Sequence, residues 1–295
     1  MNRWLITGAS GMLGREMCRL LAAEGECALP LDRRSLDLTD THAVESALRR
    51  VRPAVVVNCA AYTDVDAAET HEEQARRVNA DAVRGLARAC ARSGTRLLHL
   101  STDYVFAGDA TTPYTEGAPT GPRTAYGRGK LAGEQAVLSE LPHTGTVVRT
   151  AWLYGAHGRN FVRTMAERAT RGATVDVVND QTGQPTPARD VAERLLALGR
   201  GPARPGVFHA TAGGLTTWYG LAREVFRLAG ADPDRVRPTD STTLDRPARR
   251  PAWSVLGHDR WAAAGMPAPR HWRAALTAEF AAVTAALEGG VSCAR

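Results

Sequence analysis

Lysine is almost absent from this sequence. Of the 37 lysine and arginine residues only one is lysine, Lys130, so arginine serves wherever a generic cation is needed. Position 130 is therefore expected to require the compact, flexible ammonium of lysine rather than a planar guanidinium. Lys130 follows Tyr126 by one helical turn, which places both side chains on one helix face. A nearby ammonium lowers the pKa of a phenol, and this makes Tyr126 a candidate acid or base near neutral pH.

Cysteines, long apolar runs and basic tracts are also scarce. The five cysteines are scattered and form no C-x-x-C pair, which excludes a disulfide framework and fits a reducing cytosol. No run of about 18 apolar residues predicts a membrane span, and a strand-like segment from Arg3 leaves no room for a signal peptide. The formal charge of +6 is spread over arginine pairs without interleaved aromatics, which argues against nucleic-acid binding. We expect a cytoplasmic protein.

Several catalytic classes lack their motifs. The eight histidines show no spacing typical of zinc ligands. Neither a G-x-x-x-x-G-K-[ST] phosphate loop nor a G-x-S-x-G nucleophile elbow is present. No metal centre is therefore expected.

The first 150 residues alternate short apolar runs with longer amphipathic stretches, a pattern that favours a doubly wound parallel α/β sheet, Rossmann-like, with ligands at the carboxyl ends of its strands. The predicted strands are Arg3–Thr7, Cys27–Leu31, Ala54–Asn58, Arg96–Ser101 and Thr146–Thr150. The predicted helices are Gly11–Glu24, Thr41–Arg50, Glu72–Arg92 and Thr124–Leu141. We expect residues 1–150 to form a dinucleotide-binding domain.

Residues 151–295 are expected to form mainly a smaller, interleaved α/β substrate-binding lobe, with some segments returning to the first domain. Its predicted elements are helices at Ala188–Leu198, Thr217–Ala229 and Leu276–Leu287 and a strand at Val207–Ala210. The segment Asp232–Pro251 is predicted to be a loop, and Glu288–Arg295 a frayed tail.

Glycines follow the first predicted strand in the sequence T-G-A-S-G-M-L-G, at Gly8, Gly11 and Gly14. Such a turn at a helix start lets the backbone approach a pyrophosphate, although a plain strand–helix turn is the alternative. Asp32 ends the second strand, where a carboxylate would bind an adenosine ribose hydroxyl. Arg33 and Arg34 follow at once and would instead hold a 2′-phosphate.

Polar residues also follow the fourth and fifth strands. Thr102, within S-T-D-Y, could polarise a substrate carbonyl, although an N-cap or turn role is the alternative. Trp152 is either a core residue or a platform for stacking on a ring. The combination of Thr102 with Tyr126 and Lys130 favours the catalytic interpretation.

These residues resemble the extended short-chain dehydrogenases/reductases, and specifically the dTDP-4-dehydrorhamnose reductase branch. The resemblance extends over about residues 3–285. It is carried by T-G-A-S-G-M-L-G (7–14), V-N-C-A-A-Y-T-D-V-D-A-A-E (57–69), S-T-D-Y-V-F (101–106), Y-G-R-G-K-L-A-G-E (126–134), R-T-A-W-L-Y-G (149–155), N-D-Q-T-G-Q-P-T (179–186) and R-R-P-A-W-S-V-L (249–256).

The resemblance implies an enzyme of deoxysugar biosynthesis that reduces the C4 ketone of a dTDP-4-dehydro-6-deoxyhexose. The implied catalytic set is Thr102, Tyr126 and Lys130. The implied cofactor contacts, besides Asp32 and Arg33, are Gly8, Ser10, Gly11, Met12, Leu13, Asp37, Leu38, Ala60, Ala61, Asn79, Tyr126 and Lys130. The implied substrate contacts are Thr63, Val65, Thr102, Asp103, Tyr104, Trp152, Asn160, Arg250 and Ser254.

Alternatives remain at this point. A nucleotide-sugar epimerase or dehydratase of the same superfamily, or a non-catalytic nucleotide-binding regulatory subunit, shares much of this pattern. NADPH is the expected cofactor, with NADH possible, because Arg33 would bind the 2′-phosphate of NADPH whereas Asp32 would bind the ribose hydroxyl of NADH.

Some relatives join two subunits through Mg²⁺. Glu16 matches one of their acids, but Arg189 lies near another such position and cannot bind a cation, so no metal and either a monomer or a homodimer is expected.

Overall fold

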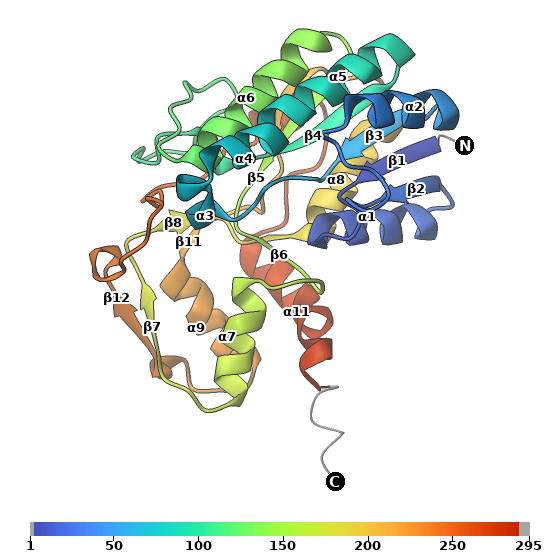
Figure 1. Cartoon of the computed structure of the whole chain (residues 1–295). Coiled ribbons are helices and arrows are strands. Elements are labelled where there is room, and N and C mark those ends of the chain that lie inside the picture. Colours follow the sequence, from blue (N-terminus) through green and yellow to red (C-terminus); the bar gives the residue numbers. More distant parts are fainter. Residues whose placement is uncertain (1–2, 289–295) are drawn as a thin grey trace.

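The structure, a computed structural model, describes residues 3–288. Its centre is a six-stranded sheet of order β2-β1-β3-β4-β5-β10, in which each pair of neighbours is parallel (Figure 1). The strands are β1 (Arg3–Thr7), β2 (Cys27–Leu31), β3 (Val55–Asn58), β4 (Arg96–Thr102), β5 (Gly145–Thr150) and β10 (Gly206–His209). The parallel doubly wound sheet predicted from the sequence is confirmed.

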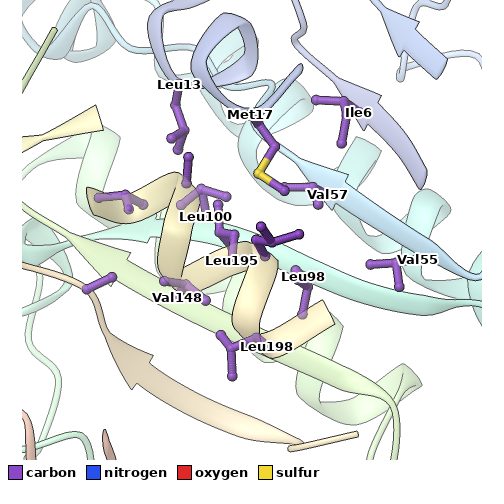
Figure 2. Packing of buried hydrophobic residues seen from close by; sticks show 14 of the residues in the cluster. Ile6, Leu13, Met17, Val55, Val57, Leu98, Leu100, Val148, Leu195 and Leu198 are labelled. Carbon is purple, nitrogen blue, oxygen red and sulfur yellow. The ribbon is translucent and has the colours of Figure 1, made fainter. Parts of the chain in front are cut away.

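Helices cover both faces of this sheet. Figure 1 shows helices above the sheet and below it. The upper ones are α2 (Thr41–Val51), α5 (Ala82–Ser93) and α6 (Ala125–Glu140), and the lower ones are α1 (Met12–Ala23) and α8 (Ala188–Arg200). Figure 2 shows how Met17 of α1 and Leu195 of α8 pack against strand residues such as Val57 and Leu98. The alternation of apolar strands with amphipathic helices thus fills two hydrophobic layers.

The strand order reverses at β1. The chain proceeds from β1 to β2 on one side and then crosses to β3 on the other side. In open parallel sheets the crevice at the carboxyl ends of such strands is the place where ligands bind. The turn after β1 and the loops after β3 and β4 meet at this edge.

A peripheral lobe, defined as α7 (Phe161–Thr170), β7 (Val175–Val178), α9 (Trp218–Leu228) and β12 (Val236–Thr239), lies beside the carboxyl edge of the sheet (Figure 1). Strands β7 and β12 pair in parallel, and α7 and α9 pack together in a separate core that includes Val162 and Phe226. Helix α11 (Trp272–Glu288) joins the same core. The short pairs are β6 (Leu153–Tyr154) with β9 (Thr186–Pro187) and β8 (Thr182–Gly183) with β11 (Thr216–Thr217).

Some predicted elements need correction. Strand β12 lies within Asp232–Pro251, which was predicted to be a loop, because it pairs with β7 far away in the sequence. The final helix begins at Trp272 rather than Leu276. The predicted tail and Cys293 lie outside the described residues, apart from Glu288, which ends α11.

The single helix predicted over Glu72–Arg92 is in fact three segments. They are α4 (Glu72–Arg76), a π-helical turn (Arg77–Asp81) and α5. The short helices α3 (Val65–Thr70) and α10 (Asp259–Ala263) were not predicted. No helix among residues 3–288 is long and apolar enough to cross a membrane.

Candidate active site

The turn between β1 and α1 brings bare backbone to the carboxyl edge of the sheet. Gly8 has a φ of +65°, and a Cβ there would lie 2.6 Å from the Ala60 nitrogen. A Cβ on Gly14 would lie 2.3 Å from the Gly8 oxygen. Gly11 caps α1 without any side-chain hydrogen bond. The turn is therefore a glycine cradle beside a helix N-terminus, where N–H groups attract a phosphate group.

A cavity of about 1020 Å³ extends from this turn across the ends of β1, β3, β4 and β5 to the peripheral lobe. Most residues that sequence reasoning assigned to a site line it. They are Gly8, Ser10, Gly11, Met12, Leu13, Asp32, Arg33, Asp37, Leu38, Ala60, Ala61, Thr63, Val65, Thr102, Asp103, Tyr104, Tyr126, Lys130, Trp152 and Arg250. The cavity has the extent expected of a dinucleotide site joined to a second ligand site.

Three predicted contacts lie behind the cavity wall instead. Asn79 is fully buried, and its amide accepts from the Tyr62 N–H at 2.8 Å and donates to the Tyr62 carbonyl at 3.0 Å. Asn160 caps α7, accepting from the Arg163 N–H at 3.0 Å. The Ser254 hydroxyl donates to the Thr182 carbonyl at 3.4 Å. In this structure these side chains hold loops in place and are not part of the lining.

Helix α6 carries Tyr126 and Lys130 into the cavity. Thr124 caps the helix by accepting from the Gly127 N–H at 3.0 Å, so Tyr126 lies in the first turn. Lys130 is buried; its Nζ donates to the Leu100 carbonyl at 2.5 Å and lies 3.4 Å from His99 Nε2. Burial lowers the pKa of Lys130 to about 8. The side chains of Tyr126 and Lys130 were expected to lie on one face of their helix, and both line the same cavity.

The phenol of Tyr126 is not acidified in this structure. Burial, followed by the negative charge of Asp103, raises the pKa of Tyr126 to about 12, while the facing Thr102 hydroxyl opposes this rise. The sequence predicted that Lys130 lowers the pKa of Tyr126. In this structure it does not, because the Lys130 ammonium donates to the Leu100 carbonyl instead. A phenol with a high pKa stays protonated at neutral pH, which is the state a proton donor needs.

The end of β4 places Thr102 and Asp103 beside the phenol. Thr102 Oγ1 donates to Asp103 Oδ1 at 2.8 Å and accepts from the Tyr104 N–H at 3.2 Å. Asp103 is buried, which raises its pKa to about 6, and within the described residues its Oδ2 has no hydrogen-bond partner. The Tyr104 ring meets Tyr126 edge-on, with the centroids 5.6 Å apart. Hydroxyl, carboxyl and phenol groups thus gather at one point of the cavity.

The far side of the glycine turn carries the competing charges of Asp32 and Arg33. Asp32 Oδ1 accepts from the N–H groups of Arg34 and Ser35, each at 3.0 Å, and from the Ser35 hydroxyl at 2.8 Å. These bonds, that of the Ser35 side chain first, lower the pKa of Asp32. Arg33 is exposed and lines the cavity, whereas Arg34 is not among the lining residues. One carboxylate oxygen of Asp32 is committed to the turn, and of the two neighbouring arginines Arg33 faces the ligand space.

The opposite end of the cavity is aromatic. The ring of Trp152 stacks on Trp218 with centroids 3.6 Å apart, and Phe161 meets Trp218 at 4.7 Å. Trp152 has a φ of +46°, an unusual conformation for a large residue, which often marks a functional site. Trp218 and Phe161 were missed by sequence reasoning. For Trp218 the available signal was an aromatic residue at the start of the predicted helix Thr217–Ala229, whereas the helix that Phe161 begins was not predicted.

Arginines border this aromatic end. Arg250 forms a two-bond ion pair with Asp66 of α3, at 2.6 and 2.8 Å. Arg246 lines the main cavity, and a neighbouring cavity of about 330 Å³ is lined by Arg123, Arg246, Arg249 and Arg250. Such a cluster favours an anionic group on the ligand.

The two residues considered for a metal-bridged contact, Glu16 and Arg189, both form ion pairs within the chain. The Arg19 guanidinium lies 2.9 Å from the Glu16 carboxylate, and Arg189 pairs with Glu193 at 3.1 Å. Within residues 3–288 no group of three or more His, Cys, Asp or Glu residues is arranged to hold a metal ion.

The family of the chain follows from its similarity to known proteins. The RmlD substrate binding domain matches residues 2–285. A dTDP-4-dehydrorhamnose reductase of Streptomyces griseus is 57% identical over 95% of this chain and 94% of its own length. A dTDP-4-keto-6-deoxy-D-glucose reductase of Streptomyces niveus is 52% identical, covering 95% and 96%. A crystal structure of dTDP-4-dehydrorhamnose reductase from Bacillus anthracis in complex with NADP has a TM-score of 0.91 at 34% identity, covering 95% and 98%. The chain therefore belongs to the RmlD family, that of the dTDP-4-dehydrorhamnose reductases.

Proposed function

We propose that this protein reduces the C4 ketone of a dTDP-4-dehydro-6-deoxyhexose with NADPH, and more slowly with NADH. The observation that carries the proposal is the meeting of Tyr126, Lys130 and Thr102 in one cavity with the glycine cradle at one end and the aromatic and arginine cluster at the other. Relatives named as reductases of dTDP sugars support the substrate class.

The residues present fit a dinucleotide. A Cβ would fill the cradle at Gly8, and the uncapped start of α1 offers N–H groups to a pyrophosphate. Asp32 and Arg33 would hold the adenosine ribose or its 2′-phosphate. The bound nicotinamide would supply the hydride that reaches the carbonyl carbon.

The chain itself supplies proton and electrostatic chemistry. Tyr126, protonated at neutral pH because its pKa is about 12, donates its proton to the ketone oxygen. Thr102 Oγ1 faces that phenol, and by turning its hydroxyl from Asp103 to the ketone oxygen it stabilises the negative charge that develops there. Lys130 holds ribose hydroxyls and supports the phenolate that remains.

The sugar nucleotide would lie at the aromatic end. The Trp152 and Trp218 rings present apolar surface to the deoxy face of the sugar, as aromatic rings commonly do for sugars and bases. The arginine cluster with Arg250 would hold the diphosphate. We further propose that the protein works in the cytoplasm as a monomer or homodimer.

An assay with the purified protein tests this function. Incubation with dTDP-4-keto-6-deoxy sugar and NADPH should oxidise the cofactor stoichiometrically, as read from the loss of its absorbance. An epimerase or dehydratase would convert the sugar without net consumption of cofactor. A non-catalytic nucleotide-binding subunit would bind the cofactor and leave both reactants unchanged.

A further inference from the structure

A row of buried polar side chains crosses the sheet beneath the catalytic edge. Thr7 Oγ1 donates to Asn58 Oδ1 at 2.6 Å, Asn58 Nδ2 lies 3.0 Å from His99 Nδ1, and His99 Nε2 lies 3.4 Å from Lys130 Nζ. All four residues are at most 2% exposed. Of these groups the mechanism proposed above uses only Lys130.

The Asn58 amide can be oriented in only one way. The Ala60 N–H, which only donates, lies 3.2 Å from the Asn58 atom assigned as Oδ1, so this atom must be the oxygen. The amide nitrogen therefore faces His99 and also only donates. His99 Nδ1 must accept, and the neutral imidazole consequently carries its proton on Nε2. Burial, followed by the charge of Lys130, holds the pKa of His99 well below its usual value, so the imidazole is neutral.

The Nε2 proton of His99 points towards Lys130. An ammonium group has three donors and no acceptor, whereas a neutral amine has one lone pair. Only the neutral amine can complete a hydrogen bond with His99, while the Leu100 carbonyl accepts from either form. Gly133 of α6 permits this approach, since a Cβ there would lie 3.4 Å from His99 Nε2 and 2.3 Å from the backbone oxygen of Asn79.

The other titratable groups around Lys130 do not cancel this bias. Glu134 on α6 favours the ammonium, but its carboxylate is held by two bonds to Arg149, at 2.7 and 2.9 Å. Cys59, after β3, keeps its proton because burial raises its pKa to about 12. Tyr126, one turn earlier on α6, is also protonated at neutral pH because its pKa is about 12.

We propose that His99 is a positioning residue that stabilises the neutral amine of Lys130 by donating its Nε2 proton, and so makes Lys130 a proton donor at near-neutral pH. The catalytic part rests on the proposed function. After Tyr126 has given its proton to the ketone oxygen, Lys130 releases one proton into the cavity, and this proton restores the phenol. Lys130 becomes the amine that His99 holds, and water from the solvent returns the proton.

The single lysine makes this proposal directly measurable. Protein labelled with ¹³Cε-lysine gives one lysine signal, whose pH titration reports Lys130 without substrate or cofactor. We expect the midpoint in the native protein to lie at or below about 8. His99→Leu keeps the site buried but removes the donor, and should raise the midpoint by about one unit or more. His99→Gln can offer an oxygen to the ammonium and should raise it further.

A control is His258→Gln, which changes a half-buried histidine that contacts the Thr211 hydroxyl, outside this polar row, and should leave the midpoint unchanged. A native midpoint near the usual 10.4 of lysine, or an unchanged midpoint in His99→Leu, would overturn the proposal. If the variants do not fold, ¹⁵N spectra of the native histidines decide the matter, because a proton on His99 Nδ1 contradicts the argument.

These readouts separate the inference from the proposed function. A protein with no reductase activity that still shows the expected titration refutes the function and keeps the proton argument. In an active protein, His99→Gln should also move the alkaline fall of kcat to higher pH. If the role of His99 were purely structural, the His99→Gln variant would be less stable, but its alkaline fall of kcat would stay at the same pH.

Discussion

The two ends of the cavity are built from different parts of the chain. At the cofactor end the surface is backbone: Gly8 and Gly14 let main-chain atoms approach to distances that any side chain would prevent. At the sugar end the surface is side chain: Trp152 and Trp218 stack, and Arg250 is fixed by Asp66. A backbone site binds what all dinucleotides share, whereas a side-chain site can be retuned by single substitutions. Cofactor binding should therefore be fragile and sugar preference adjustable.

The largest effect is expected where the two ends meet. Tyr126→Phe removes the proton donor and keeps the ring that packs against Tyr104, so the rate should fall by roughly 10²–10⁴ while stability hardly changes. Turnover at saturating cofactor and sugar measures this effect. Tyr104→Phe is the matched control and should retain most activity. The reverse ranking of the two variants would assign the donor to Tyr104.

A Cβ at the cradle should break the cofactor end. Gly8→Ala forces a left-handed residue against Ala60, and the strain of about 2 kcal/mol makes the turn relax out of shape. We expect the dissociation constant for NADPH, measured by calorimetry, to rise about 30-fold. Gly25→Ala has a similar φ of +68° and no neighbouring atom within 4 Å, so it controls for strain alone. Equal losses of affinity in both variants would disprove the cradle.

The same contrast explains which features could be predicted from the sequence. The glycine turn, the alternating elements and the Tyr126–Lys130 spacing are local patterns, and the structure has them where expected. The β7–β12 pair joins segments far apart in the chain, so no local pattern indicated it. Asn79 was a cofactor contact implied by the resemblance, yet its amide is used by Tyr62. The orientation of Lys130 towards Leu100 depends on strand β4. Contacts that form only through tertiary packing thus could not be predicted from local sequence patterns.

A smaller effect is expected at the sugar end, where the Trp152–Trp218 stack can be tested. Trp218→Ala removes the ring that supports Trp152, and a lost aromatic pair of about 1.5 kcal/mol corresponds to roughly a tenfold rise in the KM for the dTDP sugar. The affinity for NADPH should stay the same, because the cradle is untouched. Trp218→Phe should recover much of the loss. A change in cofactor affinity instead would show that the two ends are not independent.

The smallest effect is expected where the cofactor end would contact the adenosine ribose. There the side chains of Asp32 and Arg33, rather than the backbone, would set the preference between NADPH and NADH. Arg33 is exposed, and exposed ion pairs contribute up to about 1 kcal/mol. Arg33→Ala should therefore lower kcat/KM with NADPH up to about fivefold and leave kcat/KM with NADH nearly unchanged, because only the 2′-phosphate loses a partner. Arg34→Ala, outside the lining, is the matched control and should alter neither value. An equal loss with both cofactors would mean that Arg33 supports the turn rather than reads the phosphate, and that Asp32 alone sets the preference.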